Sequence, residues 1–259
     1  MARPHQVSGG GVEHHCPPAG VCNARPPNKG TRRAIYPITI THSICYYNCM
    51  FSYLLFDLDN TLYSSSFCLE KAVGQRIRQF TAQFLGISEE EAIQRREAKV
   101  AFYGTTLEWL MAEEGLIDVD AYYQAIHPEG EEASLYPDPK VREFLEQIQI
   151  PKAILTNSPM EHAQRIIKKL KLEDLFTHVF DIRWNGLRGK PQPEVFYRVL
   201  KTLGKTPQEV LFIDDFPSYV KGYLDIGGQG ILLDEEDIHK DYPYPRIRSL
   251  FEVPYFLED

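Results

Sequence analysis

Short apolar runs alternate with amphipathic stretches along the chain after residue 50. Five runs have the length and composition of buried strands, at residues 53–56, 153–155, 179–182, 210–213 and 231–233. Between several of these runs, apolar residues recur at the helical period of three to four positions. Strands separated by helices favour an α/β fold with a parallel sheet covered on both faces.

The helix predicted after the second run has a clear start signal. Ser158 can cap it, Pro159 suits its first position, and Glu161 completes a capping box. His162 lies just inside this helix, and its neighbours are expected to face solvent, so we expect it at an exposed helix position. The apolar side chains of this helix share one face: Ala163, Ile166, Ile167 and Leu170.

Residues 65–136 differ from the rest because no strand-like run stands out there. Ser88 with Glu91 forms a capping box, Gly115 closes a further helix, and Asp118 can cap another. We therefore predict that 65–136 is a helical cap inserted into a Rossmann-like core of residues 50–64 and 137–259.

The first 49 residues predict a disordered N-terminal extension. Residues 1–33 are rich in Pro, Gly and Arg and lack periodicity. Residues 34–56 carry no formal charge and resemble a signal anchor, but Pro37 interrupts them and their end is the first predicted strand. Because Met50 directly precedes that strand, one hypothesis is that residues 1–49 reflect an over-extended translation start.

The composition is that of an ordinary globular protein. The 259 residues are 43% hydrophobic and 25% charged, with a formal net charge of −8. This charge argues against nucleic acids and acidic membranes as partners. Four of the five cysteines precede residue 50, so the later part was not built around disulfides, and we expect a cytoplasmic protein.

One cysteine-containing cluster offers an alternative metal site near the N-terminus. His14, His15, Cys16 and Cys22 have the side chains of metal ligands. No second ligand pair with zinc-like spacing follows them, so a zinc site is not favoured.

Polar residues follow three of the predicted strands, and a lysine stands in the loop before a predicted helix. Asp57 and Asp59 follow the first run, and Asp214 and Asp215 follow the fourth. "TNS" at 156–158 follows the second run, and Lys190 stands in "GKPQPE". In open parallel sheets, ligands bind at the carboxyl ends of the strands, so these groups are expected to meet there.

That set suits phosphoryl transfer with a divalent cation. Carboxylate oxygens are the ligands that Mg²⁺ prefers, and a cation between them lets adjacent aspartates ionise together. One carboxylate can act as nucleophile, and a second can move a proton to the leaving oxygen and from water. The lysine and the metal would hold the charge of the phosphoryl group.

"FDLDNTLY", "LTNS", "GKPQPEVF" and "LFIDD" resemble, in this order, the four motifs of the haloacid dehalogenase superfamily. The resemblance covers roughly residues 50–234 and implies a core with an inserted cap. Further stretches resemble the pyrimidine 5′-nucleotidase-like group: "YGTTLEWLM", "YPDPKVREFL" and "TNSPMEHAQRIIKKL".

The resemblance implies roles for individual residues. Asp57 matches the nucleophile and metal ligand, and Asp59 the general acid/base whose main-chain carbonyl also meets the metal. Thr156 and the amide of Asn157 match groups that hold phosphate oxygens. Lys190 matches the residue that neutralises the nucleophile and the phosphate.

The last motif departs from the family's pattern. Asp215 aligns best with the direct metal ligand, and Asp214 stands beside it as a further ligand or as a base behind it. Phe216, Ser218 and Tyr219 occupy places where the family usually has small, polar or acidic residues. The metal affinity and the surroundings of the ligands are therefore expected to differ.

Together these features predict a Mg²⁺-dependent phosphatase acting on a small phosphorylated metabolite, with a pyrimidine nucleoside monophosphate as substrate. Another metabolite phosphatase, a phosphomutase and a non-catalytic phosphate-binding module remain alternatives. Asp59 counts against a dehalogenase, which has no leaving oxygen to protonate. Tyr103 either lines the substrate face of the cap or packs inside it. The sequence leaves the oligomeric state open.

Overall fold

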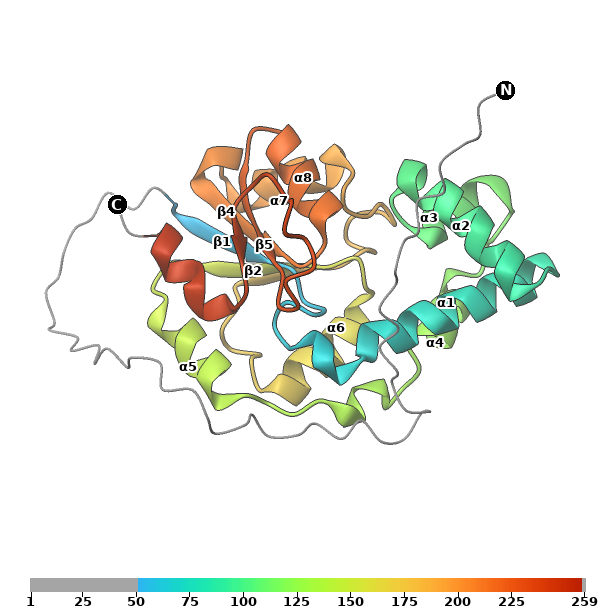
Figure 1. Cartoon of the computed structure of the whole chain (residues 1–259), viewed down its shortest axis with the longest axis horizontal. Helices are drawn as coiled ribbons and strands as arrows, with labels where there is room; N and C mark the ends of the chain where they lie inside the picture. The colour runs from blue at the N-terminus through green and yellow to red at the C-terminus, as the bar shows by residue number, and fades with distance from the viewer. Residues whose placement is uncertain (1–50, 258–259) are drawn as a thin grey trace, which may run out of the picture. The chain divides into compact units, whose positions relative to one another are not determined.

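Six parallel strands form one sheet in the order β3-β2-β1-β4-β5-β6 (Figure 1). Their bounds are β1 Tyr53–Phe56, β2 Lys152–Leu155, β3 His178–Phe180, β4 Val210–Asp214, β5 Gln229–Leu233 and β6 Arg246–Ile247. The predicted α/β class with a parallel sheet is therefore confirmed. The chain leaves β1 to one side for β2 and returns to its other side for β4, which puts a topological switch point next to β1.

The computed structural model describes residues 51–257. The predicted N-terminal extension and the histidine–cysteine cluster before residue 23 lie outside these residues. No helix in the described range is long and apolar enough to cross a membrane.

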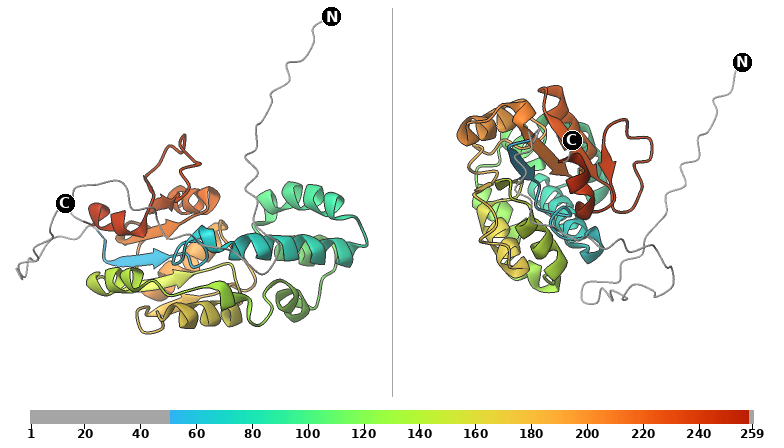
Figure 2. Two further views of the ribbon diagram at one scale, coloured as in Figure 1. Left: turned by 60° about the horizontal axis from the view of Figure 1, so that its bottom comes forward. Right: turned by 90° about the vertical axis from the view of Figure 1, so that its left-hand side faces the viewer.

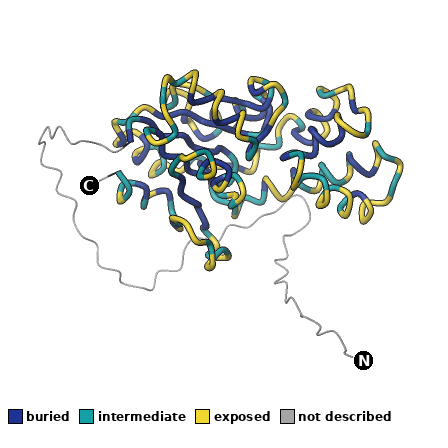
Figure 3. Tube along the Cα trace, turned by 90° about the horizontal axis from the view of Figure 1, so that it is seen from above, coloured by how far each residue is buried: buried dark blue, intermediate teal, exposed yellow. Residues whose placement is uncertain are grey.

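Alternating side chains of β1 pack into two separate apolar clusters, one on each face of the sheet. Leu54 and Phe56 belong to one cluster, and Tyr53 and Leu55 to the other. The first face is covered by α5 Pro139–Gln147, α6 Met160–Leu170 and η4 Leu250–Phe256. The second is covered by α7 Pro193–Leu203 and α8 Pro217–Asp225. Figure 2 shows these groups on opposite sides of β1, and Figure 3 shows the strands buried between them.

Four α-helices lie between β1 and α5 in sequence among the described residues, and we call them the α1–α4 segment. They are α1 Leu69–Leu85, α2 Glu89–Tyr103, α3 Thr106–Glu113 and α4 Val119–Ile126, and η2 Glu131–Ser134 follows. The Ser88 and Asp118 side chains accept hydrogen bonds from the first turns of α2 and α4, as predicted. Trp109 and Tyr122 lie in an apolar cluster formed mainly by this segment. That the α1–α4 segment forms a separate cap domain remains a prediction.

The start of α6 corrects the sequence-based prediction. Ser158 does not cap this helix, no side chain caps its Pro159 N-cap position, and the capping box with Glu161 is absent. The Ser158 hydroxyl instead donates to Asp59 Oδ2 over 2.9 Å, while the Asp181 carboxylate accepts from Met160 N. A tertiary partner has therefore replaced the local one.

Candidate active site

Asp57 stands at the carboxyl edge of the sheet, one residue beyond β1. Its N–H donates to the carbonyl of Ile213 on β4 over 2.8 Å, which extends the ladder and fixes the aspartate between two strand ends. Asp57 is buried, and one of its oxygens faces the side chain of Lys190. The sheet edge thus holds this carboxylate in place without help from a flexible loop.

Lys190 bridges the ends of two strands. Its Nζ donates to Asp57 Oδ1 over 2.5 Å and to Asp214 Oδ2 over 2.6 Å, and the residue is 0% exposed. The ring of Tyr219 lies 5.0 Å from the same Nζ. Burial lowers the pKa of Lys190, but the two carboxylates outweigh burial and raise it above its ordinary value. The ammonium therefore stays charged in the interior.

The loop that carries Lys190 is clamped by Asn157. The Asn157 Oδ1 accepts from the Lys190 main-chain N–H over 2.7 Å, and its Nδ2 donates to the Lys190 carbonyl over 3.1 Å. Thr156 is 1% exposed, and its hydroxyl accepts from the N–H of Ser158. The structure thus brings Thr156, Asn157 and Lys190 together, while their roles toward phosphate stay predictions.

Asp57, Asp214 and Asp215 form an acidic cluster in which one oxygen from each lies within 4.8 Å of the others. Asp214 Oδ1 accepts from Phe216 N, and Asp215 Oδ2 accepts from Asn60 Nδ2 over 3.3 Å. Burial, together with the charge of Asp214, raises the pKa of Asp215 to about 8. Burial and mutual repulsion make the negative charges of these carboxylates unfavourable, and a divalent cation bound between them would relieve that repulsion. Because Mg²⁺ prefers carboxylate oxygens, this cluster fits Mg²⁺.

The Asp59 carboxylate lies outside that cluster and has three hydrogen-bond donors of its own. Tyr63 Oη and His162 Nε2 each donate to Oδ1 over 2.8 Å, and Ser158 Oγ donates to Oδ2. Burial raises the pKa of Asp59, but the charge and hydrogen bond of His162 outweigh burial and lower it. The predicted contact of the Asp59 carbonyl with a metal remains a prediction.

His162 corrects the expectation of an exposed helix position, because it is 1% exposed. Its Nδ1 faces Glu131 Oε1 over 2.6 Å while Nε2 faces Asp59. Burial lowers the pKa of His162, but the two carboxylates outweigh burial and raise it to about 10. Helical spacing does place His162 on the apolar face of α6, four residues before Ile166, but it could not reveal the two partners, because both are remote in sequence.

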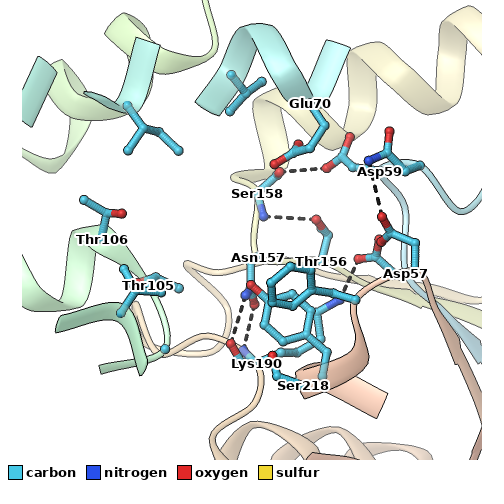
Figure 4. Close-up of a pocket in the computed structure, with 18 of the residues that line it drawn as sticks. Asp57, Asp59, Glu70, Thr105, Thr106, Thr156, Asn157, Ser158, Lys190 and Ser218 are labelled. Carbon is cyan, nitrogen blue, oxygen red and sulfur yellow. Dashed lines mark hydrogen bonds and ion pairs between the residues drawn. The ribbon is translucent and has the colours of Figure 1, made fainter. Parts of the chain in front are cut away.

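A cavity of about 1040 Å³ joins these groups to the α1–α4 segment. Figure 4 shows Asp57, Asp59, Thr156 and Lys190 around it, with Thr105 on the segment's side. The segment also contributes polar side chains to the cavity wall that were not identified from sequence. They are Glu70, Arg96, Glu97, Thr105, Thr106, Tyr122 and Tyr123. A volume of this order accommodates a small organic phosphate.

Tyr103 lies next to this wall at the end of α2. Its hydroxyl donates to Glu113 Oε1 over 2.8 Å, and its ring packs against the segment's apolar cluster. Its neighbour Gly104 borders the cavity. The predicted contact of Tyr103 with substrate therefore stays a prediction.

Known proteins are similar to this chain in sequence. A family model described as haloacid dehalogenase-like hydrolase matches residues 51–221. Phosphate metabolism protein 8 of Saccharomyces cerevisiae is 30% identical over 229 residues. This match covers 78% of this chain and 71% of the yeast protein. Hexitol phosphatase A of Escherichia coli is 29% identical over 180 residues, covering 67% of this chain and 78% of its own.

Solved structures agree on the fold. The crystal structure of a HAD phosphatase from Thermococcus onnurineus superimposes with a TM-score of 0.55 at 21% identity. The match covers 80% of this chain and 97% of the other. At that identity the likeness extends to the fold alone.

Proposed function

The chain belongs to the haloacid dehalogenase-like hydrolase family, and from this premise we propose that it is a Mg²⁺-dependent phosphatase of small phosphate monoesters. The observation that carries the proposal is the buried bridge of Lys190 between Asp57 and Asp214 at the wall of the cavity. An ammonium and a carboxylate nucleophile at one sheet edge suit the transfer of a negatively charged phosphoryl group.

In the proposed reaction, a carboxylate oxygen of Asp57 attacks phosphorus and the bond from phosphorus to the leaving oxygen breaks. This step uses the protonated form of Asp59, which the charge of His162 disfavours in the free site. Asp59 gives the leaving oxygen its proton, and the alcohol departs. Water then attacks the aspartyl-phosphate and passes a proton to Asp59, which releases inorganic phosphate and restores Asp57. Lys190 and the Thr156 hydroxyl would hold phosphoryl oxygens. Mg²⁺ bound by Asp57, Asp215 and the Asp59 carbonyl, with Asp214 beside them, would offset the charge that develops on the phosphoryl group.

For the substrate we propose a pyrimidine nucleoside monophosphate. The resemblance of the motif-flanking stretches supports this choice, and the cavity has room for such a molecule. The α1–α4 segment would act as a cap that excludes water and contacts the leaving group, through Arg96 and Tyr122 among others. A hexitol phosphate is the second candidate, because the relative from Escherichia coli is named a hexitol phosphatase. We expect the enzyme in the cytoplasm.

Two other readings of the same residues make different predictions. A phosphomutase would return the phosphoryl group to a second organic hydroxyl and release little inorganic phosphate. A non-catalytic module would bind phosphate esters without turning them over. The presence of Asp57, Asp59 and Lys190 together favours turnover, because binding alone needs no nucleophile.

The experiment is phosphate release from UMP, CMP, dTMP, AMP, phosphoglycolate and sugar phosphates, including a hexitol phosphate. Each reaction is run with Mg²⁺ and with EDTA, for the wild type and for Asp57→Asn. We expect a preference for UMP and CMP that both EDTA and the substitution abolish. Preference for another ester would refute the nucleotide assignment alone, whereas no turnover of any monoester would refute the phosphatase assignment.

A further inference from the structure

The Asp59 carboxylate is held through a buried chain of side chains that the family motifs do not include. His162 connects Asp59 Oδ1 to Glu131 Oε1, with hydrogen bonds of 2.8 and 2.6 Å from its two ring nitrogens. The His162 and Glu131 side chains are each 1% exposed. An imidazole bonded to a carboxylate at both ends can neither rotate nor shift without losing one of its partners.

Glu131 is fixed in turn from three further directions. Arg76 Nη2 donates to Oε2 over 2.7 Å, while His127 Nδ1 and Arg165 Nη2 meet Oε1 at 3.0 and 3.2 Å. Two histidines and a glutamate would also suit a metal ion. Here two guanidinium groups already contact the carboxylate, and their charge opposes a dication at the same place. The cluster is therefore an ion-pair network.

We propose that His162 and Glu131 are positioning residues that aim the Asp59 carboxylate at the leaving oxygen. The inference rests on the proposed phosphatase function, and it adds to that function two residues that never touch substrate. Proton transfer needs the donor within hydrogen-bond reach of the oxygen that receives the proton. Asp59 follows the strand end by three residues and lies on a turn, so its side chain needs this outside support to keep one orientation.

The same series of hydrogen bonds connects Asp59 to the α1–α4 segment. Glu131 lies in η2, where the chain returns from α4 to the core, and Arg76 belongs to α1. His162 belongs to α6 and packs on the sheet. Displacement of the segment would therefore pull on the support of Asp59, so that its orientation depends on where the segment lies.

Two substitutions of His162 distinguish its hydrogen bond to Glu131 from its hydrogen bond to Asp59. In His162→Asn the amide nitrogen takes the place of ring Nδ1 and can meet Glu131 but not Asp59. In His162→Gln the amide nitrogen takes the place of Nε2 and can donate to Asp59. Glu131→Gln is the third variant and removes the charge behind the imidazole. Circular dichroism and thermal unfolding verify that each variant folds.

The measurement is kcat/KM for two substrates, p-nitrophenyl phosphate and an alkyl phosphate of the preferred class. kcat/KM reports formation of the aspartyl-phosphate, and p-nitrophenolate departs without a proton whereas an alkoxide needs one. Since general acid catalysis contributes about 10²–10⁴-fold, His162→Asn should lower kcat/KM for the alkyl ester at least about tenfold more than for the aryl ester. His162→Gln should lower it less, and Glu131→Gln should resemble His162→Asn in direction.

Two controls test whether the effect passes through Asp59. His127→Gln removes another buried imidazole that bonds to Glu131 Oε1 but makes no hydrogen bond to Asp59 within the described residues, and it should change the ratio between the two substrates less than His162→Asn does. In an Asp59→Asn background, His162→Asn should cause no further change of that ratio.

The outcomes separate the two proposals. Equal losses for both substrates, or a further change in the Asp59→Asn background, would overturn the positioning role while the phosphatase stands. If His162→Asn does not fold, the same comparison with Glu131→Gln decides the question. A wild type that hydrolyses neither ester would refute the proposed function and this inference together.

Discussion

Replacing Lys190 by methionine removes the only ammonium that bridges Asp57 and Asp214 among the described residues. Methionine keeps most of the length of the side chain but lacks the ammonium that lies over the ring of Tyr219, so the main loss is the charge. Two buried carboxylates are then left facing each other without a cation between them.

The cost follows from this burial. Removing one partner of a buried ion pair destabilises a protein by about 3–5 kcal/mol, because the remaining charge stays uncompensated. Lys190 is 0% exposed and serves two carboxylates at 2.5 and 2.6 Å, so we expect the full range. At about 2–4 °C per kcal/mol for a domain of this size, the melting temperature should fall by roughly 6–20 °C.

The assay is thermal and urea unfolding of wild type and Lys190→Met in EDTA, and then with added Mg²⁺. Lys152→Met is a matched control, because Lys152 is also buried but donates to the carbonyl of Ile148 over 2.7 Å and, among residues 51–257, to no carboxylate. Loss of that hydrogen bond should cost about 1–2 kcal/mol. Lys152→Met should also keep kcat for a monophosphate, while Lys190→Met should lose it.

Mg²⁺ should stabilise Lys190→Met more than the wild type, because the variant has an uncompensated acidic cluster. A variant that unfolds within about 1 kcal/mol of the wild type in EDTA would contradict this reasoning, since it would mean that the bridge carries no net energy. Equal destabilisation by Lys152→Met would also contradict it, because the loss would then come from burial alone.

The remaining predictions concern packing and pH. Gly74→Ala should stabilise α1 by about 0.5–1 kcal/mol in urea unfolding, because the new methyl group has room. Gly189→Ala should instead destabilise the protein and lower kcat, because its methyl group would overlap Thr105. A stabilising Gly189→Ala together with a destabilising Gly74→Ala would contradict the packing. Burial raises the pKa of Glu131, but its bonds to histidines outweigh burial and lower it from 4.5 to about 2, so its stabilisation is present above pH 4.5 and is lost as the pH falls toward 2. The pKa of His162 is raised from 6.5 to about 10, so its stabilisation is present below pH 6.5 and is lost as the pH rises toward 10. Urea unfolding should therefore show a contribution from this pair that is greatest between pH 4.5 and 6.5 and that Glu131→Gln removes; parallel pH profiles of variant and wild type would contradict it.

Local sequence signals sufficed where the interactions are themselves local. The apolar runs located all of β1 to β5 to within two residues at each end. The signal is clearest for β1, β2 and β4, because strands buried on both faces need uninterrupted apolar side chains. The caps at Ser88 and Asp118 were predicted for the same reason, since each bonds to an N–H three residues away. β6 has two residues and no apolar run, so it left no such signal.

Ser158 and His162 show where local rules stop. Ser158 has the sequence context of a helix cap, but its hydroxyl bonds to Asp59, which is 99 positions away. His162 was expected at an exposed helix position, yet it lies between Asp59 and Glu131, which are 103 and 31 positions away. Only the packing of α6 against the β1 loop and η2 brings these partners together, and no sequence pattern specifies that packing.

The candidate site divides in the same way. Asp57, Asp214 and Asp215 follow strands of one parallel sheet, so their meeting could be expected from strand order alone. The cavity wall contributed by Arg96 and Tyr122 depends on how the α1–α4 segment packs, which periodicity does not specify.

The most direct test of the central claim is to look for the phosphoryl group on Asp57. The wild type is mixed with Mg²⁺ and a radiolabelled phosphate ester, quenched in acid within the first turnover, and analysed by peptide mapping. We predict acid-stable, alkali-labile label in the peptide that contains Asp57, and none in Asp57→Asn. Turnover of the ester by the wild type without any label on that peptide, or with equal label on Asp57→Asn, would contradict the assignment of Asp57 as the nucleophile.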